Sequence, residues 1–319
     1  MSWQRALAIV GSLLVPLEVG AEPPESARPN GFDLSHIVVD LAAIRPGGPK
    51  RDRIRSVDTP EFVPAEKAPW SPPTVPVIGV ALEGAAQAHP VHLLEHHQVV
   101  NTEVGGVPLV VSYDPLTGIP MAYRRTLDGK VLRFGVSGLI YNAQFLLYDR
   151  ETESLWAQYE GRAVSGPLAG KQLERVVVRQ ELMGIWFQRH PETQVLARPE
   201  RMRIDYRYSP YAEYWVSEKV PLEVRARDDR YHPKEVVLGI QLAGKARAYL
   251  GSILTSAGGR IVDDFEGQKI RVVYDTNSST FQWDIPDSVR VTEAYWFAWK
   301  SLHPETEIWR EARSDSPEQ

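Results

Sequence analysis

The sequence contains no cysteine among its 319 residues. The chain therefore has no thiol for nucleophilic catalysis or disulfide exchange, and it cannot build a zinc site from sulfur ligands. It also lacks a Gly-rich phosphate loop, a nucleophile elbow and a Ser-His-Asp order, which are signatures of common nucleotide-binding proteins and hydrolases. The formal net charge of -5 argues against a nucleic-acid partner.

What the chain does contain is typical of a folded, β-rich protein. Hydrophobic residues make up 43% of the sequence and charged residues 24%, which is enough apolar side chain for a core. Nine Trp and thirteen Tyr favour β-structure, or a surface that faces carbohydrate or protein. At roughly 150 residues per domain, the length allows one large domain or two smaller ones.

The N-terminal segment, residues 1–21, has the pattern of an export signal. Arg5 supplies a positive charge, residues 6–19 are mostly apolar, and Gly20 and Ala21 are small residues before Glu22. The apolar run is shorter than the ~20 residues of a spanning helix, so a signal peptide is favoured over an N-terminal membrane anchor. Either interpretation predicts a periplasmic or secreted body, free or anchored through residues 1–21.

Two further segments are predicted to lie outside the folded units. Residues 22–75 are rich in Pro and carry mixed charges, which predicts an extended arm. Within this arm, residues 32–41 could pair with the body as a strand or a helical turn. We expect residues 313–319 to be a disordered tail.

Three blocks of sequence recur in the same order, which indicates an internal duplication. Residues 77–94 match residues 237–254, and the segment ending at Asp114 matches the one ending at Asp275. In the third block, Trp186 and the tetrapeptide His-Pro-Glu-Thr at 190–193 match Trp299 and the same tetrapeptide at 303–306. The predicted fold class is α+β, mostly β, with a first repeat unit at 76–200, a connector at 201–235 and a second repeat unit at 236–312. The first unit alone carries a long segment of short apolar runs and turns, which predicts a strand-rich insertion.

Short helices are expected at three places. His89-Pro90 resembles a helix start with Pro at the first position, and this helix would run to about Val100. Residues 182–191 and 294–304 are amphipathic, and each ends at a Pro that cannot continue a helix.

The stretch from His97 to Gly118 is the best candidate for a site. Residues 107–113 form a β-branched apolar run, which predicts a strand buried on both faces. Asp114 and Pro115 then fit the first two positions of a type I turn that Gly118 closes. Turns at strand ends often carry functional side chains.

Four of the eight histidines lie close together in sequence. They are His89, His92, His96 and His97. In a helix the first three would share one face, and His92 and His96 have the spacing of a two-His metal site, for which Zn, Cu or Ni is suitable. The alternative is a solvated helix face, with His97 as a buried structural hydrogen-bonding residue.

A second polar segment, residues 148–156, combines Asp149, Glu151 and Glu153 with Trp156. Paired carboxylates can act in acid–base catalysis. The favoured interpretation is a polar hairpin turn between two strands of the insertion.

The order of segments resembles a bacterial family, domain of unknown function 3179. The matching pieces are DTPEFVPA at 58–65, VIGVALEGAAQAHP at 77–90, HQVVNTEVGGVPLVVSY at 97–113, FGVSGLIYN at 134–142, YDRETESLWAQ at 148–158, SGPLAG at 165–170 and WFAWKSLHPET at 296–306. The resemblance covers most of residues 55–310. It implies a secreted or periplasmic protein from a family with no established activity.

The resemblance fails at one motif. Family members usually have Cys-Pro-Leu-Cys-Gly where this chain has Asp114-Pro115-Leu116-Thr117-Gly118. A Cys pair beside the family's His, which is His97 here, would suit soft-metal binding or redox chemistry. Because Asp275 ends the matching block of the second copy, Asp114 is favoured as a turn-forming residue over a metal ligand.

These observations lead to two hypotheses. The first is an exported, non-catalytic binding or structural subunit without a cofactor, which would bind an extracytoplasmic protein or a membrane complex. The alternative is a periplasmic metal-binding protein or metalloenzyme that holds a divalent transition metal through His97, His92, His96 and Asp114.

Overall fold

The computed structural model describes residues 29–199 and 202–311. The predicted signal segment at 1–21 and the predicted tail at 313–319 therefore lie outside the described residues. Within the described ranges, no helix has both the length and the apolar character needed to cross a membrane.

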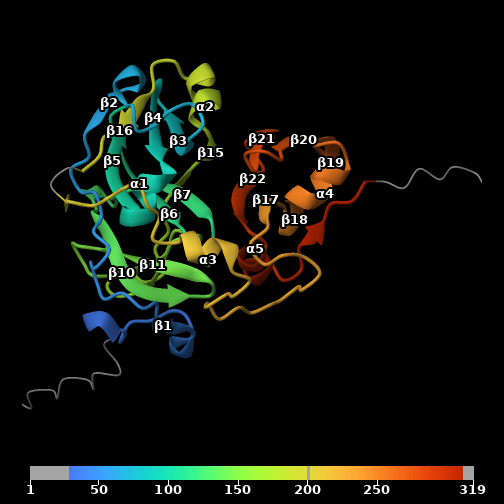
Figure 1. The fold of residues 1–319 in the computed structure, drawn as a ribbon. Coiled ribbons are helices and arrows are strands. Elements are labelled where there is room, and N and C mark those ends of the chain that lie inside the picture. The colour runs from blue at the N-terminus through green and yellow to red at the C-terminus, as the bar shows by residue number, and fades with distance from the viewer. Residues whose placement is uncertain (1–28, 200–201, 312–319) are drawn as a thin grey trace, which may run out of the picture.

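Three sheets make up the larger part of the molecule, at the left of Figure 1. The first contains β15 (Arg179–Leu182), β3 (Pro76–Leu82), β4 (Ala85–Pro90), β16 (Gln194–Leu196) and β2 (Phe62–Pro64), in that spatial order. The second contains β14 (Arg175–Val176), β7 (Ile119–Arg124), β6 (Val107–Asp114) and β5 (Val99–Val104). The third contains β1 (Ile44–Pro46), β10 (Phe134–Tyr141), β11 (Gln144–Asp149), β12 (Leu155–Ala157) and β13 (Arg162–Ser165).

Short helices and a small ribbon complete this part. They are α1 (Val91–His97), α2 (Met183–Arg189), the 3-10 turns η2 (Pro29–Gly31), η3 (Leu41–Ala43) and η4 (Ala65–Lys67), and the ribbon of β8 (Thr126–Leu127) with β9 (Lys130–Val131). The segment predicted to be rich in strands forms β10 to β13, and these strands share their sheet with β1.

The smaller part, at the right of Figure 1, has two sheets and two helices. Its sheets are β22 (Arg290–Tyr295), β17 (Val236–Leu242), β18 (Lys245–Leu250) and β23 (Glu307–Ile308), and β19 (Arg260–Phe265), β20 (Gln268–Asp275) and β21 (Thr280–Asp284). Its helices are α4 (Gly251–Ser256) and α5 (Trp296–Leu302), and α3 (Ala212–Val216) lies in the segment that links the two parts. The structure is thus mostly β, as the sequence predicts.

Part of the strand pairing is alike in the two parts. Gly79 pairs with Ala88 between β3 and β4, as Gly239 pairs with Ala248 between β17 and β18. In each part a late short strand, β16 or β23, runs parallel to the second strand of this hairpin. The meander β5-β6-β7 ends its middle strand at Asp114, and β19-β20-β21 ends its middle strand at Asp275.

A glycine and a tryptophan fit together in the same way in both parts. A Cβ atom on Gly79 would lie 2.4 Å from the Trp186 ring, and one on Gly239 would lie 2.3 Å from the Trp299 ring. The Trp186 indole N–H donates to Thr193 Oγ1 at 2.8 Å. Only glycine lets the helix carrying each tryptophan approach its sheet so closely.

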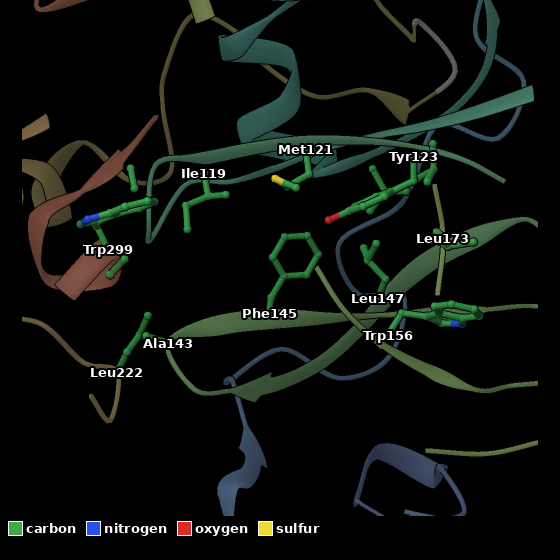
Figure 2. Packing of buried hydrophobic residues seen from close by; sticks show 14 of the residues in the cluster. Ile119, Met121, Tyr123, Ala143, Phe145, Leu147, Trp156, Leu173, Leu222 and Trp299 are labelled. Carbon is green, nitrogen blue, oxygen red and sulfur yellow. The ribbon is translucent and has the colours of Figure 1, made fainter. Parts of the chain in front are cut away.

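The largest hydrophobic cluster lies between the second and third sheets. In Figure 2, Ile119 and Met121 from β7 face Phe145 and Leu147 from β11. Trp299 of the smaller part lies in the same cluster. The core is therefore continuous between the parts, which explains why they pack together.

Two expectations differ from the structure. The segment 22–75 is not a separate arm over its described portion, because β1 pairs with β10 and β2 with β16. The predicted helix from His89 to Val100 is shorter: β4 continues through Pro90, where Ile78 pairs with His89, and the helix runs only from Val91 to His97. Sheet pairing by β4 therefore overrides the helix-start signal at His89-Pro90.

Candidate functional site

The turn after β6 is the one that the sequence predicts. The Leu116 N–H donates to Asp114 Oδ1 at 3.0 Å, and the Gly118 N–H donates to the Asp114 carbonyl at 2.8 Å. Gly118 has a φ of +70°, which glycine adopts without strain. Asp114 is only 2% exposed, so its carboxyl both holds the turn and lies within the protein.

The other turn position at which the resemblance leads one to expect a thiol, Thr117, is also buried. Thr117 is 0% exposed, and its hydroxyl has no well-directed hydrogen-bond partner among the described residues. Its carbonyl accepts a hydrogen bond from the Tyr295 N–H at 2.7 Å. The turn is thus fixed to β22 of the smaller part, and neither position carries a thiol or another soft ligand.

The linking segment covers this turn. We call residues 206–215 the tyrosine strap. Tyr214 donates its hydroxyl hydrogen to the Leu116 carbonyl at 2.6 Å, and the Trp215 indole N–H donates to the Pro115 carbonyl at 3.3 Å. The turn's outward carbonyls are therefore paired with the strap.

The same strap contacts the end of α1. The helix stops at His97, and Gln98 takes the left-handed conformation with a φ of +58°. The Gln98 amide then donates to the Tyr211 hydroxyl at 3.0 Å. Residue 98 is thus held in a conformation that non-glycine residues seldom adopt, a feature that is frequent at functional sites.

A cavity of about 250 Å³ lies beside the turn. Its walls come from the third sheet, residues 47–54, the end of α1, the turn, the strap and residue 222. The lining residues are Gly47, Pro49, Ile54, Gln98, Asp114, Leu116, Val136, Gly138, Leu139, Ile140, Phe145, Tyr211 and Leu222. Most of these side chains are apolar, and the polar ones are Gln98, Asp114 and Tyr211.

Burial changes the ionisation of two carboxyl groups near the strap. Desolvation raises the pKa of Asp114 to about 6, although hydrogen bonds such as that from Leu116 oppose the rise. Desolvation also raises the pKa of Glu95, which is 6% exposed, to about 7. A carboxyl whose pKa lies near 7 can exchange protons in the physiological range.

His97 is held by hydrogen bonds at both ring nitrogens. Nδ1 lies 2.8 Å from the Arg55 carbonyl, and Nε2 lies 2.7 Å from the Tyr206 hydroxyl. Because a carbonyl only accepts, Nδ1 carries the proton and Nε2 accepts from Tyr206. Burial lowers the pKa of His97, which favours this neutral form.

The other predicted histidines do not join His97 and Asp114 in one site. His92 and His96 lie one turn apart on α1, and His96 Nε2 is 3.0 Å from the Tyr208 carbonyl. His89 lies in β4, where its Nδ1 is 3.2 Å from the Ile78 carbonyl. Across residues 29–199 and 202–311, no three His, Asp or Glu side chains are grouped so that they could hold a metal ion.

The acidic segment at 148–156 is a hairpin between β11 and β12. The Asp149 carboxylate accepts from the Thr152 N–H at 2.6 Å and from the Trp156 indole at 2.9 Å. These bonds shape the turn, so the geometry fits the interpretation of this segment as a polar hairpin.

A second hollow, of about 910 Å³, lies between the two parts. One wall carries Tyr159, whose hydroxyl lies 2.7 Å from His303 Nε2. On another wall the Arg179 guanidinium lies 3.6 Å from the centre of the Trp283 ring. Sequence motifs do not reveal this cleft, because its residues are far apart along the chain.

The tyrosine strap is likewise absent from the sequence-based prediction, which treats its segment as a connector. A usable signal is present: residues 206–215 contain four Tyr and one Trp. Such a density of aromatic residues with polar tips is unusual in a solvated linker.

Fold and site together define a mostly-β protein with a small, largely apolar cavity beside a buried hairpin turn. The chain belongs to the family described as protein of unknown function (DUF3179), whose pattern matches residues 51–285. The matched range includes the turn, α1 and the strap, whereas residues 296–306 lie beyond it. No curated protein and no solved structure matches the chain.

Proposed function

We propose that this protein is an exported, non-catalytic binding subunit whose ligand site is the cavity beside Asp114. The observation that carries the proposal is that Asp114 and His97, the two residues expected to act chemically, are both engaged in structural hydrogen bonds. Asp114 stands where the family usually has a thiol, and its carboxyl caps the turn. Both nitrogens of His97 are engaged by Arg55 and Tyr206. What is left for a ligand is a cavity whose few polar groups lie beside the turn and whose described walls carry no Ser, Thr or Lys side chain.

The proposal includes the origin of the scaffold. We infer that units 76–200 and 236–312 arose by duplication and that the first gained the β10–β13 sheet. The equal pairing registers of the two units support this inference. The cavity uses Val136 and Phe145 of the inserted sheet, and none of its described lining residues lies beyond 222. The added segment would thus have created a ligand site that the second unit does not have.

Export and association belong to the same proposal. Residues 1–21 would direct the chain out of the cytoplasm, and its partner would be an extracytoplasmic protein or a membrane complex. The support for this part is the pattern of the N-terminal sequence. Its test is to express the full chain and locate the mature N-terminus.

Metal analysis of the purified protein tests the function most simply. The proposal predicts no stoichiometric transition metal in the wild type. A metal-binding protein that uses His97, His92, His96 and Asp114 would instead contain one metal per chain. That metal would be lost in both His97→Ala and Asp114→Asn, and such a result would overturn the proposal. Asp275→Asn, at the matching turn of the second unit, is the control and should change nothing.

A further inference from the structure

We propose that the cavity beside Asp114 binds a small organic cation, an amine with a short apolar body. This inference rests on the binding function proposed above and specifies the ligand's chemistry. The cavity offers apolar walls to the body and a buried carboxylate to the ammonium group.

The walls fit the apolar part of such a ligand. They include Ile54, Val136, Leu139, Ile140 and Phe145, and these residues come from two segments far apart in sequence. Leu139 is 0% exposed and Val136 2% exposed, so they belong to the folded core. The apolar body of a ligand would be removed from water and packed against these apolar walls, which favours binding.

The polar groups fit the ammonium. Asp114 is the only charged residue among the described residues that line the cavity, and Gln98 and Tyr211 are the uncharged polar ones. Asp114 Oδ1 already accepts from Leu116, and an ammonium donor would add a charge-assisted bond. A neutral donor would gain less, and a carboxylate ligand would be repelled.

Asp114 has no cationic side chain as a direct partner among the described residues, and the Lys234 ammonium instead lies 3.7 Å from the centre of the Tyr214 ring. The ionisable groups that interact with Asp114 are Tyr113, Tyr211, Tyr214 and Tyr295, and burial raises the pKa of each, which keeps them neutral. None of the ion pairs among the described residues includes Asp114. Glu95, close to three of these tyrosines, adds a second acid. A bound cation would therefore be a direct counter-ion for Asp114, which no side chain among the described residues provides.

The volume limits the ligand's size. Cavities of about 150 Å³ hold benzene, so about 250 Å³ corresponds to roughly ten non-hydrogen atoms. Phenethylamine is a probe of this size. Phenethyl alcohol replaces the ammonium by a neutral donor, and 3-phenylpropionate reverses the charge.

Calorimetric titration of the full chain with these three compounds tests the inference at about pH 7.5, where the Asp114 carboxyl, with its pKa of about 6, is mostly ionised. We expect phenethylamine to bind more tightly than the alcohol, and the carboxylate not to bind. Asp114→Asn keeps the turn's acceptor and removes the charge, so it should weaken amine binding by about tenfold or more and leave the alcohol unchanged. Asp275→Asn should bind the amine as the wild type does.

Two further measurements make the outcome decisive. Ile54→Trp should fill the cavity and abolish binding of both amine and alcohol. Amine affinity should fall as the pH drops through about 6, since protonation removes the Asp114 charge. Absence of amine binding to folded wild type would overturn the inference. Equal binding of amine and alcohol, unaffected by Asp114→Asn, would also overturn it while leaving the binding function standing.

Discussion

Asp114→Asn is predicted to stabilise the protein at neutral pH. The carboxyl is 2% exposed and has no ion-pair partner among the described residues, so its negative charge is costly to bury. Asn keeps the Oδ1 acceptor for the Leu116 N–H and carries no charge. The variant should therefore preserve the turn and remove the cost of ionisation.

The size of the expected stabilisation follows from the pKa of the Asp114 carboxyl. Burial raises the pKa of Asp114 from 3.8 to about 6. The difference between these two values corresponds to roughly 3 kcal/mol of folding free energy when ionisation and folding are fully coupled. Because the folded turn can relax around the charge and admit water, we expect the variant to gain about 1–3 kcal/mol.

The direction of the Asp114 pKa shift determines the pH range in which wild type and Asp114→Asn differ in stability. A carboxyl with a raised pKa in the folded protein contributes its full stability below the pKa of the unfolded chain, 3.8, and loses it as the pH rises through about 6. Wild type and Asp114→Asn should thus be similar near about pH 4. Their difference should grow between about pH 4 and 6 and then remain constant.

Urea denaturation of both proteins from about pH 4 to 8, followed by tryptophan fluorescence, measures this difference. Asp275→Asn is the matched control, because Asp275 makes the same type of bond to the Asn277 N–H at 2.9 Å but is partly exposed. Its difference from wild type should not vary in this way. A variant at Asp114 that is less stable than wild type at about pH 7.5 would refute the reasoning, because it would mean that the charge has a favourable partner.

Three other substitutions test the scaffold. His97→Ala should cost about 1–3 kcal/mol in urea denaturation, since it removes two hydrogen bonds of a buried ring to the Arg55 carbonyl and the Tyr206 hydroxyl; a change below about 0.5 kcal/mol would contradict a structural role. Gly239→Ala should lower the melting temperature in calorimetry, because the new Cβ would lie 2.3 Å from the Trp299 ring, whereas an unchanged melting temperature would show that α5 can shift freely. Thr193→Val should cost about 1–3 kcal/mol by leaving the buried Trp186 N–H without its acceptor, and Thr193→Ser should restore most of the loss; failure of Ser to do so would point to packing instead.

The sequence is sufficient for features set by local chemistry. The β-branched run at 107–113 and the turn from Asp114 to Gly118 are present as predicted, since strand propensity and the Asp side-chain bond act within a few residues. The two helices that end before His-Pro are also present, at Met183–Arg189 and Trp296–Leu302. Confirmation of the family by the match to residues 51–285 likewise rests on sequence pattern alone.

The site cannot be predicted from local sequence patterns. His89 fits a helix start by sequence, but its pairing with Ile78 places it in a strand. Tyr206 lies more than a hundred residues from His97, and no periodic pattern links the two. The strap and the cavity depend on such distant contacts, which only the folded chain brings together.

The most direct test of the central claim is the titration of the Asp114 carboxyl by carbon NMR in selectively labelled protein, with and without Zn²⁺. The claim is that this carboxyl is buried beside the cavity and has no ion-pair partner among the described residues. It predicts a pKa of about 6 that Zn²⁺ does not change. A pKa at or below the ordinary value of 3.8, or one that falls when Zn²⁺ is added and recovers in His97→Ala, would contradict it.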